Sequence, residues 1–267
     1  ILRLMHDDEF RRFIRQQGEE LYRDMPWRRD TRPYYVFASE LMLQQTQVDR
    51  VIPKFEQFIE RFPDETVLAS APLAEVLRMW QGLGYNRRAK FLHESAKLVV
   101  KLGGFPPDEA KLMALPGVGK NTAGAIRAYA FNQSAIFIET NVRAVYIHHF
   151  FADVPLVDDR DIRALLERTI DHEHPREFYW SLMDYGCYLK SQGVTPNRSR
   201  HYKKQAPLKG SIREVRGQIL TILSEGDTSM TLLEKRYEND DRFNVALDGL
   251  ISDGLIMIHD GEVYLTK

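Results

Sequence analysis

The sequence predicts a mostly helical protein that ends in a small module of helices and strands. Apolar residues recur at helical spacing over residues 1–189, and few segments alternate as strands do. The composition changes at Lys190, where a basic and irregular segment begins. After residue 210, three short helical patterns precede two β-rich runs joined by Asp260-Gly261, a dipeptide typical of hairpin turns. These observations together define an all-α region followed by an α+β module.

The individual helices can be placed by their apolar periodicity and by the residues that interrupt it. Pro63-Asp64 ends one helix and supplies the N-cap of the next. Gly103-Gly104 and the prolines after it separate two further helices. The expected helices cover, in chain order, residues 9–24, 35–62 (as two helices), 66–71, 73–81, 87–102, 109–114, 120–131, 142–151, 159–171 and 176–189.

Composition and charge restrict the classes of function. No run approaches the roughly 20 apolar residues of a membrane span, so no membrane partner is expected. The net charge of −1 means that any binding of nucleic acid must use a local basic patch. The single cysteine, Cys187, excludes an internal disulfide and fits a reducing compartment.

One motif points to chemistry. Leu115-Pro116-Gly117-Val118-Gly119-Lys120 lies between two expected helices, and Glu139 follows twenty residues after Gly119. Gly117 and Gly119 permit positive φ and close approach of the backbone, so the turn can offer N–H groups to a phosphate. The positive end of the helix that Lys120 begins favours the same anion. We interpret the motif as a device that holds DNA near a carboxylate; an ordinary turn between helices is the alternative.

The turn resembles the helix-hairpin-helix of the DNA glycosylase superfamily that includes endonuclease III. Within it, Met25–Arg28, Ser39–Val48, Trp80–Tyr85 and Leu115–Ala125 are similar to adenine glycosylases of the MutY type, in the same order along the chain. The resemblance implies a two-lobed helix-hairpin-helix glycosylase fold that flips a base into the cleft between its lobes. The expected domains are residues 1–189 (a central lobe at about 29–134, a second lobe from 1–28 plus 135–189), a basic linker at 190–210, and a winged-helix-like domain at 211–267.

The resemblance also implies the catalytic groups. Glu40 would protonate adenine at N7 so that the base can leave. The family's second carboxylate is an aspartate that stabilises the positively charged sugar, and Glu139 takes its place here. The extra methylene moves the carboxylate by about 1.5 Å, so either the site has adjusted or the activity is slowed or redirected. Bifunctional relatives have a lysine where Asn121 stands, and asparagine cannot form a Schiff base, so we expect a monofunctional enzyme.

Further residues are expected to contact DNA. Gln44 and Gln45 would contact or intercalate near the lesion. Tyr85 would wedge beside the opposite base, where aromatic stacking contributes binding energy with little sequence preference; core packing is the alternative for this residue. The residues expected to contact phosphate are Thr46, Arg88, Gly117, Gly119, Lys120, Arg198, Arg200, Lys203 and Lys204.

No metal or cluster is expected in catalysis. Most such enzymes hold an iron–sulfur cluster with four cysteines, whereas this chain has only Cys187, and Lys190 stands where the first ligand would be. The basic linker at 190–210 is expected to contact phosphates in place of the cluster loop, or else to be a solvated linker. His148-His149 and His172-Glu173-His174 are weak metal patterns. A structural alkali or alkaline-earth cation at the hairpin turn is compatible with the resemblance.

The C-terminal region departs from the family. Residues 211–267 are too short for the Nudix-like domain with which MutY-type enzymes read 8-oxoguanine, and their pattern indicates a winged helix. The candidate recognition helix, Asp241–Ser252, carries Arg242 and Asn244 but also several aspartates. We therefore expect a docking role or weak DNA binding for this domain.

These observations favour a monofunctional DNA glycosylase of base excision repair that acts on double-stranded DNA, with adenine opposite guanine or 8-oxoguanine as the preferred target. One alternative is excision of uracil, thymine or hypoxanthine by the same fold; Glu40 argues against a pyrimidine, which has no N7. The other is a catalytically inactive protein that binds DNA structures. We expect a monomer that works at the nucleoid in the cytoplasm, or in the nucleus of a eukaryote. The sequence does not identify a protein partner.

Overall fold

The computed structural model describes residues 6–202 and 205–267, and most of these residues are helical. Their contacts divide the chain into two compact units. The first unit comprises the described parts of residues 1–36, 107–114 and 118–204, and the second comprises residues 37–106, 115–117 and 205–267. No helix among the described residues is both long and apolar enough to cross a bilayer.

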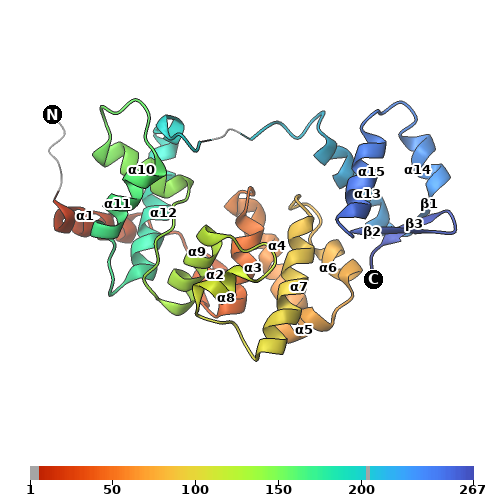
Figure 1. Cartoon of the computed structure of the whole chain (residues 1–267), viewed down its shortest axis with the longest axis horizontal. Coiled ribbons are helices and arrows are strands. Elements are labelled where there is room, and N and C mark those ends of the chain that lie inside the picture. The colour runs from red at the N-terminus through yellow and green to blue at the C-terminus, as the bar shows by residue number, and fades with distance from the viewer. Residues whose placement is uncertain (1–5, 203–204) are drawn as a thin grey trace. The chain divides into compact units, whose positions relative to one another are not determined.

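The first unit is built around its longest helix, α12 (Pro175–Ser191), which packs against several others (Figure 1). Gly18 allows the closest of these approaches, because a Cβ at that position would lie 1.9 Å from Oγ of Ser181. The helices of this unit are α1 (Asp7–Glu20), α2 (Pro26–Arg29), α8 (Glu109–Met113), α9 (Lys120–Phe131), α10 (Thr140–Phe150), α11 (Asp159–Thr169) and α12. Contacts with α12 are made by α1, α9 and α10.

A buried ion pair joins α2 to α12 inside the first unit. The guanidinium of Arg28 donates to both carboxylate oxygens of Asp184, at 2.6 and 3.0 Å. Arg23 donates a further hydrogen bond of 2.6 Å to the same carboxylate. Asp184 is 2% exposed, so both charges depend on this geometry to offset the cost of leaving water.

In the second unit, short helices enclose an aromatic core that includes Phe55, Phe58, Phe62 and Trp80. The predicted N-cap at Asp64 is confirmed, because its carboxylate accepts hydrogen bonds from the backbone N–H groups of Thr66 and Val67. The helices before the C-terminal module are α3 (Pro33–Leu43, whose first turn belongs to the first unit), α4 (Val48–Arg61), α5 (Glu65–Ser70), α6 (Leu73–Met79) and α7 (Arg87–Leu102).

The C-terminal module also belongs to the second unit and has the predicted order of three helices and a hairpin (Figure 1). Its elements are α13 (Ile212–Glu225), β1 (Thr228–Ser229), α14 (Met230–Arg236), α15 (Phe243–Ser252), β2 (Ile256–His259) and β3 (Glu262–Leu265). The three strands form an antiparallel sheet in the order β1-β3-β2. Asp260 and Gly261 both have positive φ, as the predicted hairpin turn requires.

The observed grouping differs from the predicted domains in several places, since residues 29–36 belong to the first unit and residues 211–267 belong to the second. Residues 107–114 and 118–134 group with the first unit and not with the central lobe, because α9 packs on α8 and α12. The predicted linker also begins too early. A short 3-10 helix, η1 (Pro196–Arg198), and a bridge between Val157 and Ser199 fold the residues after α12 back onto the first unit. Helical periodicity could not reveal either feature, since both depend on contacts between distant segments.

Candidate active site

The glycine turn connects α8 to α9 as predicted, but its two glycines have different roles. Gly117 has a φ of +78°, and a Cβ there would lie 2.8 Å from the ring of Phe91. Gly119 has a φ of −92°, so it does not use the positive φ that glycine permits. Gly119 is exposed, and among the described residues no atom beyond its own neighbours in the chain lies within 4 Å of where its Cβ would be. It therefore leaves the backbone at the start of α9 open to a ligand, beside the exposed Lys120.

Asn121, in the first turn of α9, is tied to the segment that carries Glu139. Its side-chain Nδ2 donates a 2.9 Å hydrogen bond to the carbonyl oxygen of Ile138, the residue before Glu139. Further along α9, Gly124 packs so closely on Phe137 that a Cβ would lie 3.0 Å from the Phe137 side chain. The side chain of Asn121 therefore holds the backbone at Ile138 in place.

The same segment is fixed from α12. The hydroxyl of Tyr179 donates to the carbonyl oxygen of Ala135 at 2.7 Å and accepts from the N–H of Phe137 at 3.3 Å. The rings of Tyr179 and Phe137 stack with centroids 3.9 Å apart. On the far side of Glu139, a Cβ at Gly186 would lie 2.7 Å from the backbone oxygen of Asn141. Contacts on both sides thus restrain the backbone around Glu139.

Glu139 occupies the N-cap position of α10 and is half-buried. Burial raises the pKa of its carboxyl above the ordinary value, and the guanidinium of Arg143 acts in the opposite direction. Arg143 is held in place by a bidentate pair with Asp159, at 2.8 and 2.6 Å. The helix N-terminus also favours the ionised form. The carboxylate is therefore poorly hydrated, and both Arg143 and the N-terminus of α10 favour its negative charge. A negative charge at this position suits a group that stabilises a cationic sugar.

Sequence reasoning missed Asn141, two residues beyond Glu139. Its Oδ1 is buried and has no hydrogen-bond partner among the described residues, while its Nδ2 lies 3.6 Å from the sulfur of Met183. A buried acceptor without a partner is costly, so such groups tend to mark functional positions. The sequence signal was its place in Glu139-Thr140-Asn141, but nothing in the pattern shows that the oxygen is unpaired.

Glu40, the predicted general acid, lies in the last two turns of α3, in the second unit. Its neighbours in the chain, Ser39, Leu41 and Met42, are fully buried, whereas Glu40 is half-buried. The packing of α3 therefore fixes the helix face on which Glu40 lies. Glu139 belongs to the first unit, and each carboxylate has its own scaffold.

The sequence predicted that Arg88 contacts phosphate, but the structure places this side chain inside the protein. The side chain is 5% exposed, and its guanidinium donates to backbone oxygens in the last turn of α3 and in the loops that follow α3 and α6. The acceptors are the carbonyl oxygens of Leu41, Met42, Gln44, Leu83, Gly84 and Tyr85. Burial lowers the Arg88 pKa to about 10. Arg88 is thus a buried clamp between residues 41–46 and 83–85.

The two clamped loops present the residues predicted to lie near the lesion. Gln45 and Tyr85 both have positive φ, of 58° and 47°, which is uncommon for residues with a side chain. Gln45 is exposed, Gln44 is half-buried, and Tyr85 is 39% exposed. Thr46 is held inside by a 3.2 Å hydrogen bond to the carbonyl oxygen of Leu83 and by the guanidinium of Arg88. Its hydroxyl is therefore engaged within the protein, against the phosphate contact that we predicted.

The basic segment is partly structural. Nη1 of Arg198 donates to the carbonyl oxygens of Phe151, Ala152 and Val154, which follow the end of α10, so this nitrogen is engaged within the protein, and the phosphate contact of Arg198 stays a prediction. Arg200 is exposed but pairs with Asp158 at 3.6 Å. Lys203 and Lys204 lie outside the residues that the structure describes. The sequence showed the charges but not the carbonyl oxygens that they meet.

A four-thiolate cluster does not fit the residues present. The chain contains one cysteine, Cys187, and where the structure describes the chain, no three His, Cys, Asp or Glu side chains group as metal ligands would. Arg198 and the Val157–Ser199 bridge hold the segment after α12 by hydrogen bonds.

Comparison with known proteins agrees with this arrangement. Residues 38–170 match the model of the HhH-GPD superfamily base excision DNA repair proteins. The chain is 34% identical over 258 residues to an adenine DNA glycosylase of Mycolicibacterium smegmatis, which covers 88% of both chains. It is 37% identical over 171 residues to an adenine DNA glycosylase of Buchnera aphidicola, with 62% of this chain and 48% of that protein covered.

Among solved structures, a thermostable thymine-DNA glycosylase superposes with a TM-score of 0.61 and 25% identity, over 67% of this chain and 85% of that one. The helical fold, the glycine turn and these relatives agree in placing the protein among base excision repair glycosylases. The chain belongs to the HhH-GPD superfamily and, within it, to the adenine DNA glycosylase family.

Proposed function

We propose that this protein is a monofunctional adenine DNA glycosylase that hydrolyses the N-glycosidic bond of adenine mispaired with guanine or 8-oxoguanine. The observation that carries the proposal is the 34% identity to an adenine DNA glycosylase over 88% of both chains. The retained carboxylates at Glu40 and Glu139 support the same chemistry. The fold of the family implies duplex DNA as the partner, and we expect the enzyme to act on it as a monomer.

In the proposed reaction, the carboxyl of Glu40 donates a proton to N7 of the flipped adenine as the bond between C1′ and N9 breaks. The base then leaves as neutral adenine, and the sugar carries a positive charge. The Glu139 carboxylate stabilises this charge through space. A water molecule adds to C1′ and loses its proton to the Glu40 carboxylate, which restores the acid for the next turnover.

The product of this reaction is an intact strand with an abasic site. Strand cleavage by the enzyme would need an amine that attacks C1′ and forms a Schiff base. Asn121 supplies no such amine, and its side-chain nitrogen is engaged with the carbonyl oxygen of Ile138. We therefore propose that the enzyme has no lyase activity. The proposed mechanism uses no iron–sulfur cluster and no catalytic metal ion.

A second candidate function is excision of thymine or uracil opposite guanine. The observation that favours it is the 25% identity to the thymine-DNA glycosylase structure. It conflicts with the role of Glu40, because pyrimidines have no N7 to accept a proton. Hypoxanthine, a purine, is compatible with the same acid.

Single-turnover cleavage of labelled duplexes tests the proposal. The duplexes carry A:8-oxoG, A:G, U:G, T:G or hypoxanthine pairs, and each reaction is analysed with and without alkali. We expect strand breaks from the two adenine duplexes only after alkali. Breaks from the uracil or thymine duplexes alone would overturn the proposed substrate, and breaks without alkali would overturn the monofunctional assignment.

A further inference from the structure

The C-terminal module is docked on the segment of the second unit that carries Tyr85. Gln81 donates a 3.2 Å hydrogen bond to the carbonyl oxygen of Leu220 in α13. Lys90 donates a 2.8 Å hydrogen bond to the carbonyl oxygen of Asp253, just after α15. The module is thus hydrogen-bonded to residues that precede and follow Tyr85 in the chain.

Tyr85 itself is bound by two side chains from this region. Its hydroxyl accepts hydrogen bonds from Nε2 of Gln205 and from the guanidinium of Arg213. The Arg213 guanidinium also lies 5.1 Å from the centre of the Tyr85 ring, and that of Arg88 lies 5.5 Å from it. The ring of Tyr85 is therefore in contact with two cations and anchored at its hydroxyl, although its side chain is 39% exposed.

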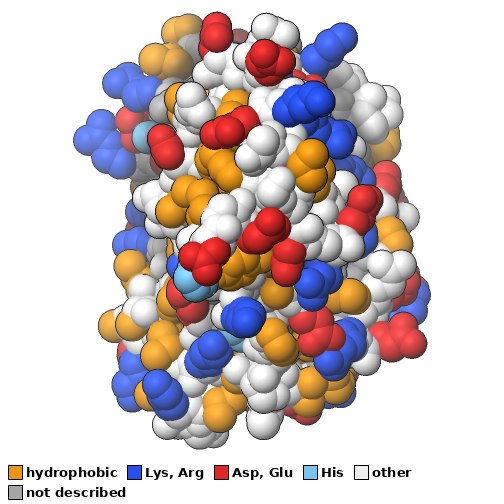
Figure 2. Space-filling view, turned by 90° about the vertical axis from the view of Figure 1, so that its right-hand side faces the viewer, with side chains coloured by type: hydrophobic (Ala, Val, Ile, Leu, Met, Phe, Trp, Pro, Cys, Tyr) orange, Lys and Arg blue, Asp and Glu red, His pale blue; other side chains and the backbone are white. Residues whose placement is uncertain are grey.

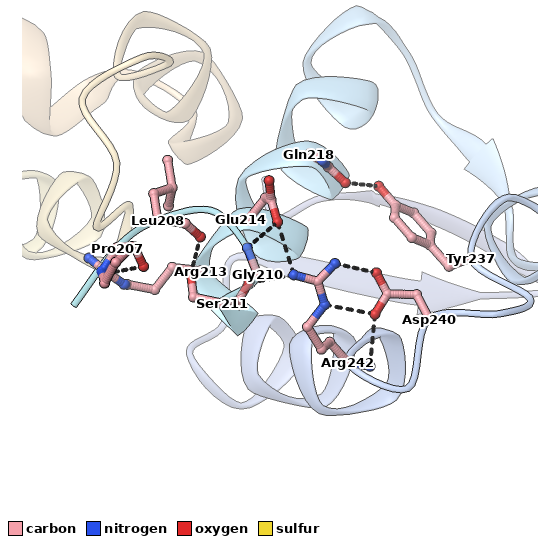
Figure 3. Close-up of polar contacts among 10 residues, drawn as sticks. All are labelled: Pro207, Leu208, Gly210, Ser211, Arg213, Glu214, Gln218, Tyr237, Asp240 and Arg242. Atoms are coloured by element: carbon pink, nitrogen blue, oxygen red, sulfur yellow. Dashed lines mark hydrogen bonds and ion pairs between the residues drawn. The ribbon is translucent and has the colours of Figure 1, made fainter.

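The position of Arg213 is set by the turn that begins α13. Glu214 accepts hydrogen bonds from the N–H of Gly210 and from Arg242, both at 2.9 Å, which fixes the turn on the module. Arg213 donates to the carbonyl oxygen of Ala206 at 2.7 Å. Figure 3 shows its side chain directed toward Pro207, away from the cluster around Arg242. The turn thus presents Gln205 and Arg213 together to Tyr85.

Two other cations of the module, Arg242 and Arg216, are engaged internally. Arg242, at the start of the candidate recognition helix, pairs with Asp240 and Glu214 (Figure 3). Arg216 pairs with Asp253. On the face seen in Figure 2, acidic and basic side chains are interspersed and form no continuous basic surface. This arrangement is poor for reading a major groove, which requires unpaired cationic or polar side chains.

We propose that Arg213 is a positioning residue for Tyr85, and that the C-terminal module contributes to DNA recognition by setting the orientation of this wedge. The inference rests on the proposed function and on the role expected from the sequence, in which Tyr85 inserts beside the base opposite the excised one. The ring of Tyr85 would lose orientational freedom when it inserts into DNA. A hydrogen bond that fixes the ring before binding reduces this entropic cost and so strengthens DNA binding. Arg213 acts on the protein side of the wedge and does not touch the reacting atoms.

A double-mutant cycle tests this inference. Tyr85→Phe keeps the ring and removes the hydroxyl, Arg213→Met removes the cation, and the third variant combines both. Lys235→Met, an exposed lysine on α14, is the matched control. The readouts are the dissociation constant for a duplex with a tetrahydrofuran abasic analogue opposite 8-oxoguanine and the single-turnover rate at saturating enzyme.

We expect Tyr85→Phe and Arg213→Met each to weaken duplex binding by about tenfold. The double variant should bind no more weakly than the weaker single variant, because both changes remove the hydrogen bond between Arg213 and the Tyr85 hydroxyl. For Arg213→Met, the saturated rate changes less than twofold, and Arg213→Lys restores part of the affinity that Arg213→Met loses. Binding by Arg213→Met equal to that of Lys235→Met, or fully multiplicative effects in the double variant, would overturn the inference. If Arg213→Met does not fold, Tyr85→Phe and Gln205→Ala provide the same test through the hydroxyl.

The outcomes separate this inference from the proposed function. The abasic analogue needs no cleavable base, so coupling between Tyr85 and Arg213 can be measured even if adenine is not the substrate. Coupling without adenine release overturns the proposed substrate alone. Adenine release without coupling overturns the positioning role alone.

Discussion

Replacing Arg88 by methionine tests whether one buried guanidinium holds the two loops that present Gln45 and Tyr85. Charge-assisted hydrogen bonds contribute about 1.5 kcal/mol or more each, so the six carbonyl acceptors represent a gross gain on the order of 9 kcal/mol. The desolvation that lowers the Arg88 pKa to about 10 costs about 3 kcal/mol. Several acceptors share one donor nitrogen and can rehydrate, so we expect Arg88→Met to lower the free energy of unfolding by about 3–5 kcal/mol.

Urea unfolding followed by circular dichroism measures this loss, with Arg78→Met, an exposed arginine on α6, as the control. Arg88→Lys keeps the charge but offers fewer donors, so it should fall between the wild type and Arg88→Met. Since both clamped loops are expected to contact DNA, binding of a duplex should weaken in the same order. Equal stability of Arg88→Met and Arg78→Met would refute the clamp.

Three further predictions concern the first unit. Glu139→Gln should lower the single-turnover rate of base release by about 10²–10³, and Glu139→Asp by about 10–100, if the site has adjusted to the longer side chain. Asp184→Asn should reduce the free energy of unfolding in urea by about 3–5 kcal/mol, because it leaves the buried guanidinium of Arg28 without its carboxylate. Burial lowers the pKa of His149 from 6.5 to about 4, so between these pH values the folded state binds fewer protons than the unfolded state. The free energy of unfolding in urea should therefore fall by about 1–2 kcal/mol from pH 7 to pH 5. His149→Gln should make this fall smaller.

Each of these predictions has an opposing outcome. A faster reaction in Glu139→Asp would mean that glutamate fits the site poorly and that the family's aspartate is still preferred. An Asp184→Asn variant within 1 kcal/mol of the wild type, roughly the effect of an ordinary surface change, would mean that water satisfies Arg28. The same pH dependence of unfolding in His149→Gln and the wild type would assign the acid loss of stability to other groups.

Local sequence signals predicted the elements well. The cap at Asp64 and the turn at Asp260-Gly261 depend on two or three adjacent residues, and both have the expected geometry. The positions of the helices follow from apolar periodicity for the same reason. The grouping of α9 with α12 was not predicted, because it depends on which apolar faces meet after the chain has folded.

The arginines mark the limit of sequence reasoning at the site. Arg88 and Arg198 were assigned to phosphate because a cation beside a DNA-binding motif is normally expected to meet the backbone of the nucleic acid. In the structure, both meet carbonyl oxygens that come from other segments of the chain. A sequence gives the charge of a side chain but not its burial. Burial decides whether the cation can bind a DNA phosphate or is hydrogen-bonded within the protein.

The identity of the general acid is the central claim of the mechanism, and the Glu40→Gln variant tests it most directly. The measurement is the single-turnover rate of adenine release from an A:8-oxoG duplex, alongside the dissociation constant for the duplex with an abasic analogue. Glutamine preserves the shape of the side chain but has no acidic proton, so the account predicts loss of release with unchanged binding. Release at the wild-type rate by Glu40→Gln would contradict it.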